Sequence, residues 1–334
     1  MSSWTSARPD TDRPGATSGS SAPLRVAVID TDSGFLQVLG KRLDLWRLSN
    51  FVLTRLPSPG AAAEEPAPPA LKRRIRHSVS AWCYASLFRA GKDKPASMTF
   101  EDFCRACQRL GLESVELLNE DQWPAVKKAG LTCAMCNGPD SIPYGWNRLE
   151  HHDDLLAKFE VAIPKVAQAG FANIITFSGN RKGMSDAEGL ANCAKGLKRL
   201  MPIAEKHRVT VCLELLNSKH SHKDYMADHT AWGVELCRQV GSERLKLLYD
   251  IFHMQIMEGD IIHTIRESHP YIGHYHTGGV PGRNEIDNTQ EIYYPAIMQA
   301  IVDTGYKGFV GQEFVPRRPD PLASLKQAIQ ICDV

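Results

Sequence analysis

The chain has 334 residues, of which 43% are hydrophobic and 23% are charged, and its formal net charge is +1. This length and composition suit one large α/β domain of about 250 residues together with an extension. A net charge so close to zero gives no general attraction to nucleic acid or to an anionic membrane, and no apolar run reaches the roughly 18 residues of a membrane span. We therefore expect neither nucleic acid nor a membrane as a partner.

The first 75 residues are expected to form an extension. Residues 1–23 are rich in Ser, Pro, Gly, Thr and Asp, which predicts disorder. They lack the apolar segment of a secretory signal, so we expect a cytoplasmic protein. Residues 24–45 predict one strand and one amphipathic helix, and they resemble the opening of a bacterial receiver domain, although a lone βα unit cannot bury its own apolar face. Residues 57–69 have the composition of a linker.

From residue 76 to the end, strand patterns alternate with helix patterns. The predicted strands are 77–84, 114–118, 132–137, 173–178, 210–217, 245–251, 272–277 and 308–314. The predicted helices are 99–110, 121–129, 151–169, 187–207, 230–240, 259–268, 293–304 and 321–332. Eight βα units that close on themselves form a (β/α)8 TIM barrel, which is the predicted fold of residues 76–334. The alternative, an open doubly wound sheet, is disfavoured because its phosphate-binding glycine fingerprint is absent from the sequence.

Nine cysteines raise the question of a zinc site. Cys104 and Cys107 fall in a helix pattern, where cysteine serves as a small core residue. Cys133 and Cys136 fall in a predicted strand, where a separation of three points the two thiols to opposite faces. We therefore expect all nine cysteines to be reduced and structural, as in a reducing compartment.

Four predicted strands in the C-terminal half end with a side chain that can bind a metal ion. These side chains are Glu214, Asp250, His276 and Glu313. Parallel strands place their carboxyl ends at one face of a barrel, so we expect the four groups to converge there. Three carboxylates and one imidazole form a site for one divalent cation, with Mn²⁺ or Mg²⁺ expected and Co²⁺ or Zn²⁺ also suitable.

Such a site is suited to proton transfer between adjacent carbons of an α-hydroxycarbonyl compound. The cation stabilises the enediolate, and a carboxylate beside it takes and returns the proton. Glu214 and Glu313 are the predicted catalytic groups, because they approach from the fifth and eighth strands. Arg283, His253 and Glu116 are predicted to bind substrate, since each lies at or just beyond the end of a predicted strand.

Several segments of the C-terminal half resemble a known family. The segments are DIFHMQIMEGD at 250–260, GHYHTGGVPGRNEID at 273–287 and GYKGFVGQEF at 305–314. They are similar to the xylose isomerase-like superfamily of sugar phosphate isomerase and epimerase barrels, above all to its hydroxypyruvate isomerases. The resemblance covers roughly residues 76–334, and it implies a TIM barrel with one divalent metal held by the four residues named above.

The sequence departs from the family pattern at two positions. His276 stands where we expect glutamine in the hydroxypyruvate isomerases, and histidine is what the ketose epimerases carry there. His220 stands where the epimerases place a substrate-binding glutamate, six residues after Glu214, so we also count His220 among the predicted substrate-binding residues.

The leading prediction is a metal-dependent isomerase of a small hydroxycarbonyl compound, an intramolecular oxidoreductase of the aldose–ketose type similar to hydroxypyruvate isomerase. A ketose 3-epimerase and an inosose-type dehydratase are alternatives on the same site. A more distant alternative is an endonuclease IV-like nuclease, which needs a multi-zinc cluster and a basic groove. A receiver-linked binding module rests on residues 24–45 alone. The expected partners are a small-molecule substrate and, because barrels of this group often associate, further copies of the chain.

Overall fold

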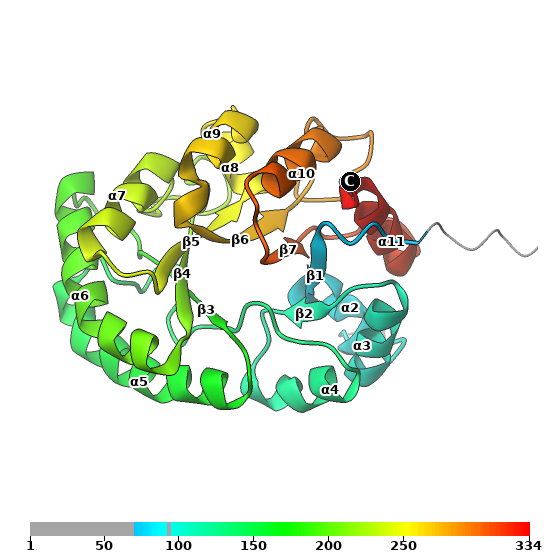
Figure 1. Ribbon diagram of the computed structural model, residues 1–334, viewed down its shortest axis with the longest axis horizontal. Coiled ribbons are helices and arrows are strands. Elements are labelled where there is room, and N and C mark those ends of the chain that lie inside the picture. Colours follow the sequence, from blue (N-terminus) through cyan, green and yellow to red (C-terminus); the bar gives the residue numbers. More distant parts are fainter. Residues whose placement is uncertain (1–69, 92–94) are drawn as a thin grey trace, which may run out of the picture. The chain divides into compact units, whose positions relative to one another are not determined.

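The computed structural model describes residues 70–91 and 95–334. These residues belong to one compact unit of the chain, and Figure 1 shows their strands arranged as a ring surrounded by helices. The receiver-like fragment 24–45 and the linker 57–69 lie outside the described residues. Within the described part of the chain, no helix is both long and apolar enough to cross a bilayer.

Seven parallel strands form one sheet in the order β2-β1-β7-β6-β5-β4-β3. Among the described residues the first strand, β1, pairs with the last, β7, and Arg76 stands opposite Phe309, as a closed ring requires. The strands are β1 (Arg76–Ser80), β2 (Ser114–Glu116), β3 (Asn173–Thr176), β4 (Thr210–Glu214), β5 (Leu245–Asp250), β6 (Ile272–Thr277) and β7 (Phe309–Gln312).

The predicted strand 132–137 closes the ring between β2 and β3. Thr132 pairs with Ser114, and Cys136 pairs with both Leu118 and Ile174, each through a single parallel bridge. Backbone hydrogen bonds of 3.0 Å run from the Cys136 N–H to the Asn173 carbonyl and from the Ile175 N–H to the Cys136 carbonyl. The predicted barrel is therefore confirmed. Its eighth strand position is filled by an irregular segment instead of a regular strand.

The irregular path of residues 132–137 also corrects one prediction. The Cys133 and Cys136 sulfur atoms lie 3.8 Å apart and face each other, so the expectation of opposite faces was wrong. The alternation of side chains holds only in a regular pleated strand, and this segment is paired only at single bridges. All nine cysteines are free and buried, as expected.

The helices cover the outside of the ring (Figure 1) and follow the predicted order. Most predicted boundaries lie within about three residues of the observed ones, but two predictions that concern helices were wrong. Strand β1 ends at Ser80, and Ala81–Tyr84 forms the 3-10 helix η2 instead of continuing the strand. The helices are α2 (Ala85–Phe88), α3 (Phe100–Arg109), α4 (Trp123–Lys128), α5 (His152–Gln168), α6 (Asp186–His207), α7 (Thr230–Val240), α8 (Ile251–Met257), α9 (Ile261–Ser268), α10 (Tyr294–Asp303) and α11 (Pro321–Cys332).

The second wrong prediction concerns helix α8, where the sequence analysis placed no helix. The carboxylate of Asp250 accepts a hydrogen bond of 3.2 Å from the backbone N–H of His253 and caps the first turn of α8 directly after β5. The predicted helix 259–268 corresponds to α9 alone. Capping by Asp250 fixes the place of His253 in the first turn of a helix at the mouth of the barrel.

Candidate metal centre and cavity

The four predicted metal ligands meet at the carboxyl ends of four neighbouring strands. Glu214 and Asp250 are the last residues of β4 and β5, His276 is the next-to-last residue of β6, and Glu313 directly follows β7. Each offers one ligand atom, and the four atoms all lie within 4.8 Å of one another. All four side chains are buried. The folded barrel thus brings together residues that are up to 99 positions apart in the sequence (Glu214 to Glu313).

The donor set fits one divalent cation. The Nδ1 atom of His276 lies 2.5 Å from Glu313 Oε2 and 3.6 Å from Glu214 Oε1. This Nδ1 atom is buried, does not meet the geometry of a hydrogen bond, and has two carboxylates as its close neighbours. Three carboxylate oxygens and one imidazole nitrogen are ligands that hard and borderline divalent metals accept.

Burial and neighbouring charges separate the pKa values of the two glutamates. Burial raises the pKa of Glu214 to about 7, and the charges of Glu313 and Asp250 add to that rise. Burial acts on Glu313 in the same direction, but the adjacent Arg283 and His276 hold its pKa well below the usual range. Two carboxyl groups with such different proton affinities can take the different roles of acid and base.

Arg283 is the principal cation that faces the cluster. Its Nη2 atom lies 2.6 Å from Asp250 Oδ2 and also donates to the carboxylate of Glu313. Its Nε atom donates to the Glu313 carbonyl at 2.9 Å, and Nη1 lies 2.6 Å from His253 Nε2. Its guanidinium is therefore engaged by the protein and offsets part of the negative charge of the cluster. The rings of Trp82 and Phe252 lie against it, with centroids at 5.7 Å and 5.0 Å.

The cluster opens into a cavity of about 420 Å³. Trp82, which is 45% exposed, stands at its edge and donates a hydrogen bond of 2.6 Å from Nε1 to Glu313 Oε1. His253 is fully buried and is fixed by Asn217, whose backbone N–H lies 3.2 Å from His253 Nδ1. The cavity is lined by Trp82, Leu117, Asn119, Asn137, Gly138, Asp140, Ile142, Ile175, Phe177, Glu214, Leu216, His222, His253, Arg283 and Glu313.

Two of the predicted substrate-binding residues do not line this cavity. His220 is exposed, because Asn217 Oδ1 accepts the backbone N–H groups of His220 and Ser221 and turns the chain outward there. Glu116 is fully buried inside the barrel, where its Oε1 atom contacts two histidines of β6. The other two, His253 and Arg283, do line it.

Among the titratable residues of the cavity wall, sequence reasoning missed two, His222 and Asp140. The ring of His222 packs edge-on against that of His253, with centroids 5.3 Å apart. Asp140 Oδ2 accepts hydrogen bonds from Thr176 Oγ1 at 2.6 Å and from the Phe177 N–H at 2.8 Å, and burial raises the pKa of Asp140 to about 7. Both lie in loops, where no hydrophobic period indicates which way a side chain faces.

The raised pKa of Asp140 predicts how one substitution changes the pH dependence of stability. In the unfolded chain an aspartate titrates near pH 4, whereas in the fold the pKa is about 7. The folded state therefore holds the extra proton between these values, and Asp140 costs stability as the pH rises through that window. Asp140→Asn removes the cost, so its melting temperature relative to wild type should rise from pH 5 to pH 8. Thermal unfolding at each pH measures this difference.

A control variant isolates the effect of burial on Asp140. The side chain of Asp153 is 89% exposed, so Asp153→Asn removes the same charge from the surface. Its melting temperature relative to wild type should stay nearly constant over the same pH range. A constant difference for Asp140→Asn as well would contradict the assignment.

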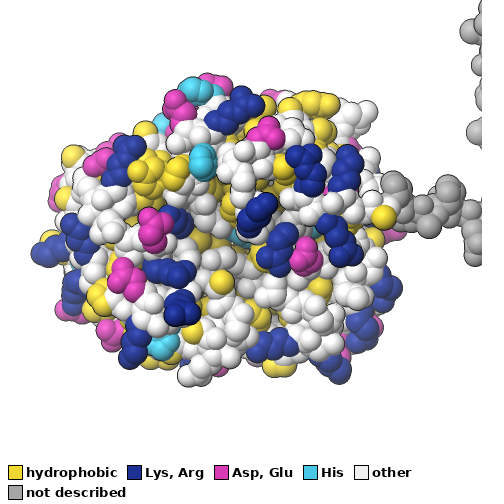
Figure 2. Space-filling view, viewed as in Figure 1, with side chains coloured by type: hydrophobic (Ala, Val, Ile, Leu, Met, Phe, Trp, Pro, Cys, Tyr) yellow, Lys and Arg dark blue, Asp and Glu magenta, His cyan; other side chains and the backbone are white. Residues whose placement is uncertain are grey.

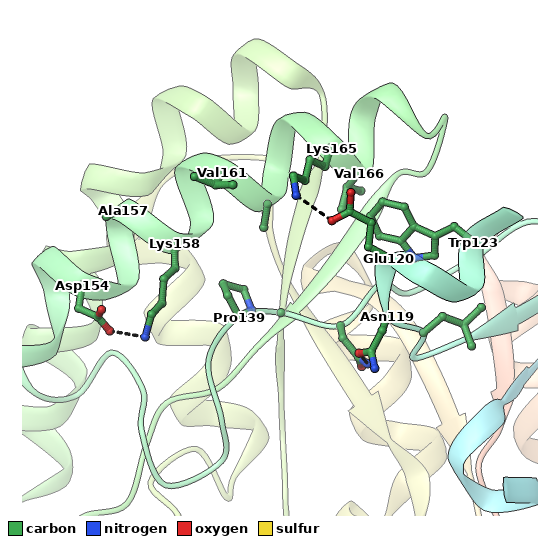
Figure 3. Close-up of a pocket in the computed structure, with 14 residues that line it drawn as sticks. Asn119, Glu120, Trp123, Pro139, Asp154, Ala157, Lys158, Val161, Lys165 and Val166 are labelled. Carbon is green, nitrogen blue, oxygen red and sulfur yellow. Dashed lines mark hydrogen bonds and ion pairs between the residues drawn. The ribbon is translucent and has the colours of Figure 1, made fainter. Parts of the chain in front are cut away.

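A second cavity of about 500 Å³ lies outside the ring, between α5 and the segment formed by η3 (Glu120–Gln122) and α4 (Figure 3). Its two acidic side chains are paired with lysines: Lys165 Nζ lies 2.8 Å from Glu120 and Lys158 Nζ lies 2.7 Å from Asp154. It shares Asn119, Asn137 and Gly138 with the first cavity. Glu214 and Glu313 of the cluster line only the first of these two cavities, so we place the chemistry there.

The molecular surface agrees with the composition. Figure 2 looks along the same direction as Figure 1, and on this face Lys and Arg side chains are interspersed with Asp, Glu and uncharged groups. The net charge of the whole chain is only +1. On this one face of the described residues, the basic side chains do not form the continuous groove that a nucleic-acid backbone requires.

Comparisons with known proteins agree with the fold. Residues 102–333 match the family described as xylose isomerase-like TIM barrel. The human protein called putative hydroxypyruvate isomerase is 35% identical over 233 residues, which cover 64% of this chain and 83% of that protein.

Two solved structures are similar to the fold. An AP endonuclease of family 2 from Brucella melitensis has a TM-score of 0.62 at 21% identity, over 75% of this chain and 97% of that one. A D-psicose 3-epimerase with D-tagatose from Clostridium cellulolyticum H10 has a TM-score of 0.60 at 18% identity, over 78% of this chain and 100% of that one. At these identities the likeness concerns the barrel alone.

Proposed function

We propose that this chain, which belongs to the xylose isomerase-like TIM barrel family, is a metal-dependent isomerase of a small hydroxycarbonyl compound. It is an enzyme of the isomerase class, like the human relative of which it covers 83%. The observation that carries the proposal is the convergence of four donor atoms within 4.8 Å at the mouth of the barrel. Hydroxypyruvate is the substrate that the name of the human relative suggests.

The residues of the cluster divide the work of proton transfer. A divalent cation held by Glu214, Asp250, His276 and Glu313 would stabilise the negative charge that develops on the substrate oxygens. Glu214 and Glu313 both line the cavity and approach it from different strands. One carboxylate can therefore remove a proton from one carbon while the other returns it to the neighbouring carbon. Trp82 and Arg283 hold the carboxylate of Glu313 in place for this step.

Charge balance supports a cation at this site. When all three carboxylates are ionised they carry −3, Arg283 carries +1 and a divalent cation adds +2, which sums to zero. Without the cation, the excess of negative charge is costly in a protein interior, and the charges of Glu313 and Asp250 help to raise the pKa of Glu214. In a site that is neutral before the reaction, the cation can stabilise the negative charge that forms on the substrate oxygens.

The size of the cavity favours ketose epimerisation as a second candidate. Its volume of about 420 Å³ lies within the range of small-molecule sites and leaves room for a substrate larger than a three-carbon acid. A ketose of five or six carbons would use more of this space. Its 3-epimerisation needs the same proton removal, followed by return of the proton to the opposite face of the same carbon.

Exchange of substrate protons with solvent tests both candidates. The chain is depleted of metal, supplied with Mg²⁺ or Mn²⁺, and incubated in D₂O with hydroxypyruvate, dihydroxyacetone or D-fructose. We expect C–H to C–D exchange, followed by NMR or mass spectrometry, only when the cation is present and with saturation at one metal per chain. The product then separates isomerisation from epimerisation. Exchange that does not depend on metal would contradict the proposal, and three zinc ions per chain would favour the nuclease.

A further inference from the structure

Beneath the metal centre, Glu116 reaches across the inside of the barrel. Glu116 ends β2, whereas His274 and His276 belong to β6, and the sheet order places β1 and β7 between these strands. Even so, Glu116 Oε1 lies 2.7 Å from His276 Nε2 and 2.9 Å from His274 Nε2. All three side chains have no exposed surface. The contact therefore crosses the barrel interior and joins strands that do not pair.

A glycine makes this crossing possible. Gly311 of β7 stands beside His276 in the sheet register. A Cβ atom at position 311 would lie 2.3 Å from Glu116 Oε1 and 2.9 Å from His276 Cδ2, closer than real Cβ atoms come to such neighbours. The φ angle of Gly311 is not among the positive values of the chain, so the backbone does not demand glycine here. The absence of a side chain at 311 serves to leave room for the carboxylate of Glu116.

The hydrogen bonds determine which nitrogen of His276 carries a proton. An ionised carboxylate only accepts hydrogen bonds, so Nε2 of His276 must donate to Glu116. In a neutral imidazole the other nitrogen then carries a lone pair. That nitrogen, Nδ1, faces Glu214 Oε1 at 3.6 Å and Glu313 Oε2 at 2.5 Å, on the side of the metal centre. A carboxylate behind a metal-binding histidine fixes both the tautomer and the direction of the ring.

We propose that Glu116 is a positioning residue for the metal centre, which holds His276 with Nδ1 aimed at the cation, and that Gly311 is required for this contact. The inference rests on the metal site of the proposed function and adds two residues that act through His276. A second cation bound by Glu116, His274 and His276 is the rival interpretation. One ligand atom from each of these residues lies within 4.8 Å of the others, so the number of ions bound per chain separates the two interpretations.

Metal affinity measured without substrate tests the proposal. Mn²⁺ is titrated into the metal-depleted full chain by calorimetry for wild type, Glu116→Gln and Gly311→Ala. We expect both variants to bind Mn²⁺ about 10- to 100-fold more weakly, although Gly311→Ala removes no polar group. The double variant should bind no more weakly than the weaker single variant, because both changes act through the same ring. Unchanged affinity in Glu116→Gln would overturn the proposal, and so would two Mn²⁺ ions per wild-type chain.

A control glycine and a spectroscopic signature separate positioning from a general loss of structure. The control glycine is Gly273, which lies in β6, the strand of His276. A Cβ atom at position 273 would lie 2.8 Å from Lys246 Cβ, away from the metal centre. Gly273→Ala should therefore disturb the barrel wall yet keep wild-type Mn²⁺ affinity. If Gly273→Ala lowered the affinity for Mn²⁺ as much as Gly311→Ala does, the effect would be a general loss of structure and the proposal would fail.

Nitrogen-15 NMR of histidine-labelled, Zn²⁺-loaded chain reports the tautomer directly. The signals of His276 are assigned from those missing in His276→Gln. They should show a single tautomer protonated on Nε2 in wild type and a changed pattern in Glu116→Gln. An identical pattern in both would count against the proposal. Because these measurements need no substrate, a chain that binds Mn²⁺ as expected but isomerises nothing would sink the proposed function and leave this inference standing.

Discussion

Glu313→Gln should lower kcat for proton exchange by at least about 10²-fold while the chain remains folded. Glutamine keeps the size of the side chain and can still accept the hydrogen bond from Trp82, so the packing around it is retained. It loses the charge that holds the cation and the basic oxygen that takes the proton. The expected result is near-complete loss of metal-dependent C–H exchange, with a far-ultraviolet circular dichroism spectrum like that of wild type.

A second glutamate provides the matched control. Glu258 accepts hydrogen bonds from the N–H and Oγ1 of Thr230, at 2.6 and 2.7 Å, and does not line the cavity. Glu258→Gln therefore removes a carboxylate of the same size from a comparable hydrogen-bonded setting. It should leave exchange within a factor of a few of wild type. Full exchange activity in Glu313→Gln would remove Glu313 from the mechanism.

Arg283→Met should lower the free energy of unfolding of the metal-free chain by about 3–5 kcal/mol. The Arg283 side chain is only 14% exposed and contacts the carboxylates of Asp250 and Glu313, which are almost fully buried. Methionine fills much of the same space but leaves these charges without a partner in the interior. A divalent cation would replace the missing charge, so added Mn²⁺ should stabilise the variant more than it stabilises wild type.

Urea unfolding with and without Mn²⁺ measures both effects. Arg181 is the matched control, since it pairs with Asp228 and Asp186 away from the cavity and its side chain is 22% exposed. Arg181→Met should also lose stability, but its gain from Mn²⁺ should equal that of wild type. An equal Mn²⁺ gain in Arg283→Met would show that Arg283 does not compensate the charge of the metal centre.

The sequence predicts the barrel and the metal cluster because both follow from regular patterns. Apolar runs mark the strands, and parallel strands align their carboxyl ends, so Glu214 and Glu313 could be expected at one face before any coordinates were known. The structure brings them together as that rule requires. The same rule predicted neither helix α8 nor the first-turn position of His253, because a single capping carboxylate decided it.

Contacts made through loops or across the barrel are harder to predict. His220 and His222 differ by two positions in one loop, and the hydrogen bonds of Asn217 decide which of them faces outward. Glu116 stands at a strand end, as substrate-binding groups do, but the missing side chain at Gly311 lets it turn beneath the cluster. The identity of a residue on a third strand thus determines its role, and no local pattern around Glu116 contains that information.

Pairing of β1 with β7 has a consequence for how the protein is made. The partners Arg76 and Phe309 are 233 positions apart (309 − 76), so β1 has no neighbour on that side until β7 has been synthesised. During translation the growing chain therefore presents an open sheet edge, the kind of surface on which chains aggregate. Glu313 directly follows β7 and is the last of the four donors to emerge from the ribosome. Closure of the ring and completion of the cation site thus become a single late event in biosynthesis.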